Sequence, residues 1–310
     1  MPDIITIGEI LVEIMAEKKE QTFLQPGTFR GPFPSGAPAI FADQAARMGA
    51  DCGMISRVGD DDFGRLNLKR LRDDGVDVTH VTVDPDRLTG IAFVTYREDG
   101  DRSFIYHFKD SAVGHFTLQK TDEDYLIKAK YLHIMGCSLL ASPQLAQAAA
   151  RGVDLAVKHG VQVSFDPNIR PELLRNEETR QIFNLILRQA DLILTGVEEL
   201  RQITGCTAVE DGAAQLLQTA SLVVVKNGSR ETNLYRQGKR ISVAPFSVDE
   251  VDPTGAGDCF DGAFIAALVQ GHEAEEAVRF GCAAGALAVR QKGPMEGASW
   301  RKEIEALVYA

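Results

Sequence analysis

The sequence lacks the marks of several protein classes. None of its five cysteines forms a C-x-x-C pair, and no histidine stands at zinc-site spacing from them. We therefore expect reduced thiols rather than a metal or disulfide framework. No basic segment followed by a long apolar stretch opens the chain, and no later stretch reaches membrane-spanning length without a charge. These absences favour a cytoplasmic protein without a membrane partner.

Positive charge is also scarce. Lys and Arg number 33 against 44 Asp and Glu, and the resulting net charge of -11 disfavours nucleic acid as a partner. The first apolar run leads into Gly8, Glu9 and Ile10 instead of a G-x-G-x-x-G turn before a helix. A dinucleotide-dependent oxidoreductase is therefore not indicated.

Short apolar runs alternate with amphipathic segments along the chain, and 45% of the 310 residues are hydrophobic, enough for a full core. We expect strands at residues 4–7, 52–58, 131–135, 161–165, 191–195 and 222–226. Helices are expected at residues 39–48, 63–74, 143–159, 177–190, 257–270 and 273–290. This order predicts one α/β domain over residues 1–310, a doubly wound and mainly parallel sheet with helices on both faces. The carboxyl half is expected to be a run of crossover units, with ligands at the carboxyl ends of the strands.

Two stretches break this alternation, residues 11–36 and residues 89–108. The first is rich in Pro, Gly and aromatics, and the second alternates like paired strands around a turn at residues 98–101. We interpret them as one small β insertion, here called the lid. It is expected to cover the ligand edge or to form a homodimer contact, and the alternative is that it is decoration.

The most informative segment is D-P-T-G-A-G-D-C-F-D-G-A-F-I at residues 252–265. Small residues at Gly255, Ala256 and Gly257 leave backbone N–H groups unhindered at the start of a helix, where the helix dipole also favours an anion. Asp258 could cap that helix, or it could serve as a catalytic base beside a bound phosphate. A glycine-rich turn alone is weak support for either role.

As a whole, this segment closely resembles the carboxyl-terminal signature of the PfkB or ribokinase-like carbohydrate kinases. Residues 35–42, followed by Gly49 and Gly59, resemble the companion signature, and the likeness spans essentially the whole chain. It implies an ATP-dependent sugar kinase of the ribokinase-like fold, with ATP and Mg²⁺ as cofactors and K⁺ as a further candidate. A nucleoside or vitamin-precursor kinase would share this fold and turn, and a catalytically silent sugar-binding protein, expected if the base, the anion turn or Glu198 were lost, is the other alternative.

The resemblance assigns roles around phosphoryl transfer. It makes Asp258 the base, while the N–H groups of Gly255, Ala256 and Gly257 hold the charge on the transferred group. Residues 195–198 stand where the family has N-x-x-E, so Glu198 would act on magnesium through water. Asp252 and Thr254 would help to hold a monovalent cation. Residues on the nucleotide side would be Asn168, Lys226, Gly228, Ser229 and Gly257.

The acceptor side is assigned in the same way. The resemblance points to Glu13, Gly36, Ala37, Tyr106 and Arg170 as substrate-binding residues. Glu13, Glu198 and Arg170 each have a plainer alternative as exposed surface residues. Two departures from the family pattern bear on the substrate, because Ile40 stands where an Asn is usual and Phe108 stands where ketodeoxygluconate kinases place an Arg. An apolar ring cannot neutralise a carboxylate. The sequence therefore favours a neutral ketohexose such as tagatose or fructose at least as much as 2-keto-3-deoxygluconate.

Overall fold

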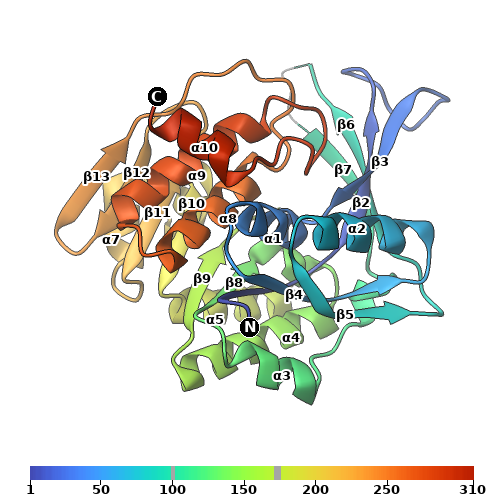
Figure 1. Ribbon diagram of the computed structural model, residues 1–310, viewed down its shortest axis with the longest axis horizontal. Helices are drawn as coiled ribbons and strands as arrows, with labels where there is room; N and C mark the ends of the chain where they lie inside the picture. The colour runs from blue at the N-terminus through green and yellow to red at the C-terminus, as the bar shows by residue number, and fades with distance from the viewer. Residues whose placement is uncertain (99–101, 171–175) are drawn as a thin grey trace.

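The computed structural model describes residues 1–98, 102–170 and 176–310. Within them, nine strands form one sheet in the order β13-β12-β11-β10-β9-β8-β1-β4-β5 (Figure 1). These are β1 (Ile4–Ile7), β4 (Cys52–Gly59), β5 (Asp77–Asp84), β8 (Tyr131–Met135), β9 (Gln162–Asp166), β10 (Leu192–Gly196), β11 (Leu222–Lys226), β12 (Thr232–Arg236) and β13 (Lys239–Val243). Strands from β11 to β5 pair in parallel, which confirms the predicted fold class.

Successive residues of a strand point to opposite sides of the sheet. A continuous apolar run such as β11 therefore buries side chains on both faces. In β11, Leu222 and Val224 join one core, whereas Val223 and Val225 join the other. The first core is covered by α1 (Ala37–Arg47), α2 (Asp62–Asp73), α8 (Ala256–Val269), α9 (Ala274–Ala288) and α10 (Arg301–Val308). The second is covered by α3 (Lys120–Leu126), α4 (Pro143–His159), α5 (Glu177–Gln189), α6 (Val197–Thr204) and α7 (Val209–Leu216), with the short helices η1 (Val113–His115) and η2 (Gly136–Leu140).

One part of the carboxyl half differs from the expected run of crossover units. After β11 the chain forms the antiparallel hairpin β12–β13 at the edge of the sheet. Residues 237 and 238 alone separate these strands, with Gly238 at φ +68°. Two residues can close a hairpin but cannot carry a parallel crossover, so the sheet ends in antiparallel strands.

The two lid segments form a single four-stranded sheet, as predicted, in the order β3-β2-β6-β7. Its strands are β2 (Leu11–Ala16), β3 (Phe29–Ser35), β6 (Gly90–Tyr96) and β7 (Arg102–His107), and they extend away from the main sheet in Figure 1. Strands β6 and β7 pair antiparallel, while residues 99–101 of the expected turn lie outside the described residues.

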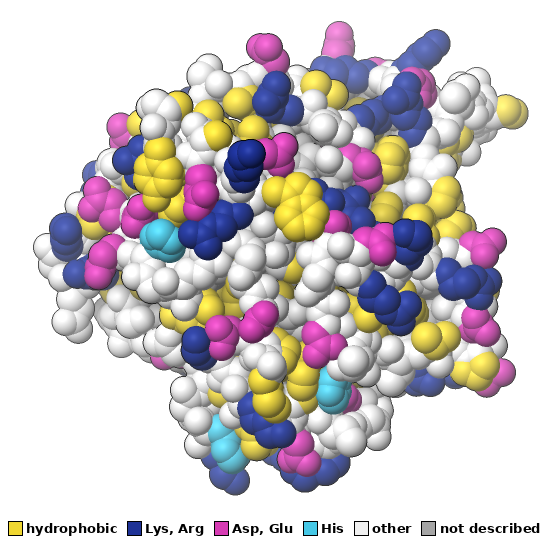
Figure 2. Space-filling view, viewed as in Figure 1, with side chains coloured by type: hydrophobic (Ala, Val, Ile, Leu, Met, Phe, Trp, Pro, Cys, Tyr) yellow, Lys and Arg dark blue, Asp and Glu magenta, His cyan; other side chains and the backbone are white. Residues whose placement is uncertain are grey.

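The protein surface carries charged side chains of both signs, in agreement with the composition of the sequence. Figure 2 shows acidic and basic side chains interspersed over the face in view. Among the helices that the structure describes, none is long and apolar enough to cross a membrane.

Candidate active site

A cavity of about 260 Å³ lies at the carboxyl ends of five neighbouring parallel strands. Each strand, or the segment after it, contributes at least one residue to the lining, among them Glu9 after β1, Cys137 after β8, Asp166 in β9, Gly196 in β10 and Lys226 in β11. The other walls come from the lid, the start of α1 and the start of α8. This is the edge at which open parallel sheets bind ligands.

The glycine-rich turn leads directly into α8, which begins at Ala256. Gly255 has φ +80°, and a Cβ at this position would lie 2.2 Å from the carbonyl oxygen of Pro294. Only glycine fits there without strain. The turn therefore directs the first N–H groups of α8, including that of Gly257, toward the cavity, where they can bind an anion.

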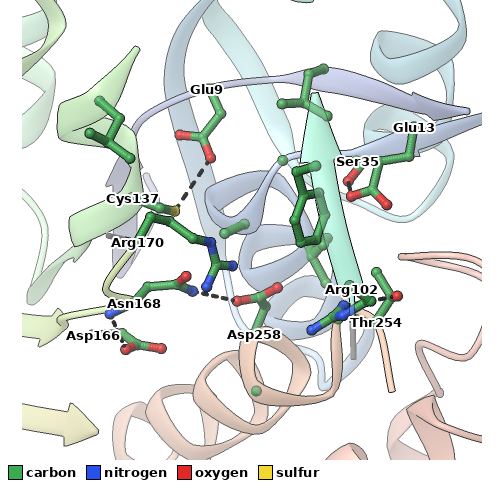
Figure 3. Close-up of a pocket in the computed structure, with 18 of the residues that line it drawn as sticks. Glu9, Glu13, Ser35, Arg102, Cys137, Asp166, Asn168, Arg170, Thr254 and Asp258 are labelled. Atoms are coloured by element: carbon green, nitrogen blue, oxygen red, sulfur yellow. Dashed lines mark hydrogen bonds between the residues drawn. The ribbon is translucent and has the colours of Figure 1, made fainter. Parts of the chain in front are cut away.

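Asp258 lies in the first turn of α8 and lines the cavity. Burial, and to a lesser extent the charge of Asp166, raises the pKa of its carboxyl group to about 7, against the opposing effect of nearby cations. Asn168 Nδ2 donates to Asp258 Oδ1 at 3.3 Å, and Figure 3 shows the two side chains facing each other. A carboxylate with a pKa near neutrality is suited to accept a proton from a hydroxyl group.

The residues that we predicted to bind the acceptor line one cavity, and their role stays a prediction. Glu13 Oε1 accepts from the Ser35 hydroxyl at 2.6 Å, while Oε2 is buried without a partner. Burial raises the pKa of Glu13 to about 7. Gly36, at φ +112°, precedes Ala37 at the start of α1, and both line the cavity.

Arg170 and Tyr106 close the same side. Arg170 is largely buried, its Nε has no hydrogen-bond partner, and its guanidinium points into the cavity in Figure 3. Tyr106 reaches the cavity from β7 and stacks on Phe104 at 5.3 Å between ring centroids. The unpartnered Arg170 Nε could donate to an anion such as a phosphate, whereas the unpartnered Asn168 Oδ1 could accept from a hydroxyl group of a ligand.

Lys226 forms the centre of a buried ion cluster. Its Nζ lies 2.9 Å from Asp166 Oδ2 and 2.9 and 3.0 Å from the two oxygens of Asp261. Asp261 is fully buried one turn after Asp258, so the cluster ties β9, β11 and α8 together.

A second cavity of about 500 Å³ adjoins the first. Both are lined by Lys226, Pro253 and Gly257, so the anion turn lies where they meet. Gly228, at φ +55°, and Ser229, both predicted for the nucleotide side, line the second cavity. Asn168, which we also expected there, lines the first cavity beside Asp258. The larger second cavity suits the larger of two ligands.

Glu198 is not placed as expected. Its side chain is 76% exposed and forms an ion pair with Arg201 on the surface of α6. The neighbouring Glu199 lines the cavity and accepts from the backbone N–H groups of Ile169 and Gly196, at 2.9 Å each. Burial raises the pKa of Glu199, with a further contribution from the charge of Asp166. The carboxylate that faces the cavity from this helix is therefore Glu199.

Asp252 and Thr254 lie together at the entrance to the anion turn. Asp252 Oδ1 accepts from the N–H and hydroxyl of Thr254, and Oδ2 accepts from the Tyr96 hydroxyl and the Gly293 N–H. In the structure, protein donors thus satisfy the carboxylate that we expected to hold a monovalent cation, and a cation role for these residues stays a prediction.

Several lining residues were given no role from the sequence: Glu9, Ser35, Arg102, Phe104, Cys137, Asp166 and Glu199. Glu9 could have been identified from the sequence. It stands four residues before Glu13, and alternate residues of extended chain share a face, so both glutamates should face the same side. The Ser138 hydroxyl and the Cys137 thiol donate to its buried carboxyl group.

A carboxylate of near-neutral pKa at the start of a helix, beside a glycine-rich turn and at the junction of two cavities, is the arrangement expected of a phosphotransferase that acts on an alcohol group. A family model described as "pfkB family carbohydrate kinase" matches residues 1–301. The chain therefore belongs to the PfkB family of carbohydrate kinases, and the predicted fold, family and enzyme class are confirmed.

Known relatives cover nearly the whole chain. Fructokinase-1 of Oryza sativa subsp. japonica is 33% identical over 314 residues, which cover 98% of this chain and 96% of the relative. A protein from E. coli provisionally named ribokinase II, solved with ATP and Mg²⁺, is 44% identical with a TM-score of 0.94, over 100% of this chain and 99% of that one. A double mutant of the fructokinase from Vibrio cholerae O395, solved with fructose, ADP and potassium, is 28% identical with a TM-score of 0.86, over 99% and 98% of the two chains. The ligands of the last two relatives agree with the predicted cofactors.

Proposed function

We propose that this carbohydrate kinase transfers the γ-phosphoryl group of MgATP to a hydroxyl group of a ketohexose, with fructose as the first candidate. The observation that carries the proposal is the position of Asp258, which lines the smaller cavity at the turn that this cavity shares with the larger one. A sugar bound in the smaller cavity would place its hydroxyl between this carboxylate and a nucleotide in the larger one.

The walls of the smaller cavity support a neutral, hydroxyl-rich acceptor. Glu9 and Glu13 offer carboxyl groups, and Ile40 and Phe108 add apolar surface where a carboxylate on the acceptor would need a cation. Fructokinases from several plants are 30–33% identical to the chain over almost its whole length. Tagatose and 2-keto-3-deoxygluconate are the other candidates from the sequence.

The chain's own residues account for the transfer step. Asp258 takes the proton of the acceptor hydroxyl as that oxygen bonds to the γ-phosphorus and the bond to the departing ADP oxygen breaks. The N–H groups of the Gly255–Asp258 turn hold the charge on the transferred group. Magnesium usually binds to nucleotide phosphates with one or two carboxylates, and Glu199 is the carboxylate that we propose near it.

The decisive experiment measures ADP release from MgATP with fructose, tagatose, ribose, 2-keto-3-deoxygluconate, adenosine and fructose 6-phosphate, and with a blank that contains no acceptor. We expect turnover with a neutral ketohexose. Preferred turnover of 2-keto-3-deoxygluconate would contradict the argument from Ile40 and Phe108, and turnover of adenosine would establish a nucleoside kinase. Nucleotide binding without turnover on a wider sugar panel would indicate a silent binding protein.

An Asp258→Asn variant tests the base. Turnover should fall about 10²–10⁴-fold while the Kd for the sugar stays within a few-fold of wild type, because the amide keeps the shape of the site but accepts no proton. A variant within a few-fold of wild-type turnover would show that another group is the base. The cytoplasmic location and a homodimer formed through the lid stay predictions, the latter to be tested by sedimentation at micromolar concentration.

A further inference from the structure

Arg102 of the lid reaches the anion turn of the main domain. It is the first residue of β7, and its Nη1 donates to the Thr254 hydroxyl at 2.9 Å. Thr254 immediately precedes Gly255 in the turn that leads into α8. A side chain from an inserted β-sheet is thus held at the anion turn, 152 residues away in sequence.

Arg102 and Arg170 lie on one aromatic ring. The guanidinium carbon of Arg102 is 5.6 Å from the ring centroid of Phe104, and that of Arg170 is 5.8 Å from the same centroid. Both arginines line the cavity that contains Asp258, and Figure 3 shows the Asp258 carboxylate with Asn168 and Arg170 on one side and Arg102 on the other. Cation–π attraction to this ring helps to hold both guanidinium groups beside the cavity.

The positive charge of Arg102 acts on carboxyl groups in the part of the cavity that contains Asp258. Burial dominates the raised pKa of both Asp258 and Glu13, but among the charges that oppose this rise, Arg102 contributes at both carboxyl groups. Over such short distances in a partly buried site, a full positive charge is worth far more than at the surface. Arg102 therefore provides positive electrostatic potential in the part of the cavity where the transferred phosphoryl group must pass.

We propose that Arg102 is a catalytic residue whose guanidinium contacts the transferring phosphoryl group, opposite the N–H groups of the Gly255–Asp258 turn. This inference rests on the proposed phosphoryl transfer. A guanidinium offers a planar array of donors that matches phosphate oxygens, and lysine cannot reproduce it. Because Arg102 belongs to the lid, the lid must lie over the cavity to complete the set of charges around the phosphoryl group.

The test compares Arg102→Ala and Arg102→Lys with Arg30→Ala. Arg30 is a matched control, because it lies on β3 of the same lid, is 55% exposed and pairs with Glu17 away from the cavity. We expect both Arg102 variants to lose about 10²–10³-fold in kcat. KM for the sugar should change less than about threefold, and the Arg30 variant should resemble wild type. Millimolar guanidinium ion should restore part of the activity of Arg102→Ala but none of Arg102→Lys, whose amine still fills the site.

A binding measurement tests the role of Arg102 even when no turnover can be detected. The Kd for ADP with aluminium fluoride, which resembles the transferring phosphoryl group, should rise about 10²-fold in Arg102→Ala, whereas the Kd for ATP should change little. A rise in the sugar KM at unchanged kcat would overturn the inference and make Arg102 an acceptor-binding residue. Equal behaviour of the Arg102 and Arg30 variants would also overturn it. Wild-type protein that phosphorylates no sugar would instead count against the proposed function, while the aluminium fluoride comparison would still decide the role of Arg102.

Discussion

Raising the pH from 6 to 8 should increase kcat/KM for the sugar about tenfold, because Asp258 must be deprotonated to act as a base. Burial raises its pKa to about 7, so the carboxyl group is mostly protonated at pH 6 and mostly ionised at pH 8. The ionised fraction goes from about 9% to about 91% for a single group with this pKa. An unperturbed aspartate would be ionised throughout this range and would give no change.

The assay follows ADP release at limiting sugar and saturating MgATP, with pH steps of half a unit from 5.5 to 9. We expect a single limb that rises with pH, has a midpoint near 7 and is flat above pH 8. A flat profile between pH 6 and 8, or a rate that falls over this range, would refute the assignment of a buried, near-neutral base.

Glu13 provides the necessary control, because burial also raises its pKa to about 7. In a Glu13→Gln variant the sugar KM should rise, but the limb should persist with its midpoint near 7. Loss of the limb in this variant would assign the titration to Glu13 and would leave Asp258 without support from the pH profile.

Three further changes probe the rest of the site. Gly255→Ala forces a side chain into φ +80° and against the carbonyl oxygen of Pro294, so it should lower the free energy of unfolding by about 1–3 kcal/mol in denaturant titrations and reduce turnover sharply. Lys226→Met leaves two buried aspartates without their cation and should cost about 3–5 kcal/mol by the same measurement; a loss below 1 kcal/mol would contradict the ion cluster. Glu199→Gln should raise the Mg²⁺ concentration for half-maximal rate roughly tenfold, whereas Glu198→Gln, its exposed neighbour, should not.

The first and last residues of an element could be predicted where local sequence signals mark its ends. The helix α4 begins at Pro143 after Ser142, whose hydroxyl accepts from Leu145 N, and it ends before Gly160 in the left-handed conformation. Proline at the first position and glycine after the last are the expected signals, and the predicted bounds of 143–159 are those of the structure. The short apolar run of β11 was equally clear.

The offset between Glu198 and Glu199 shows what a motif alone leaves open. Adjacent helix positions differ by about 100°, so one of two consecutive glutamates faces the cavity while the other faces solvent. The choice depends on where α6 begins. Glu199 bonds back to the Gly196 N–H at 2.9 Å, three residues earlier, as glutamates in the first turn of a helix often do. That spacing is readable in the sequence and would have identified the inward-facing residue.

Arg102 could not have been placed from the sequence, for a different reason. Its contact with Thr254 requires that β6 pair with β2 in parallel and that β7 then pair with β6. The β6–β7 hairpin was expected from the sequence, but local propensity does not set the pairing of β2 with β6, because these lid segments lie far apart in the sequence and must meet before the guanidinium can reach the turn. The anion turn and base, by contrast, come from one continuous segment that forms α8. The proposed base and the anion turn are therefore local in sequence, whereas the contribution that we propose for the lid depends on tertiary structure.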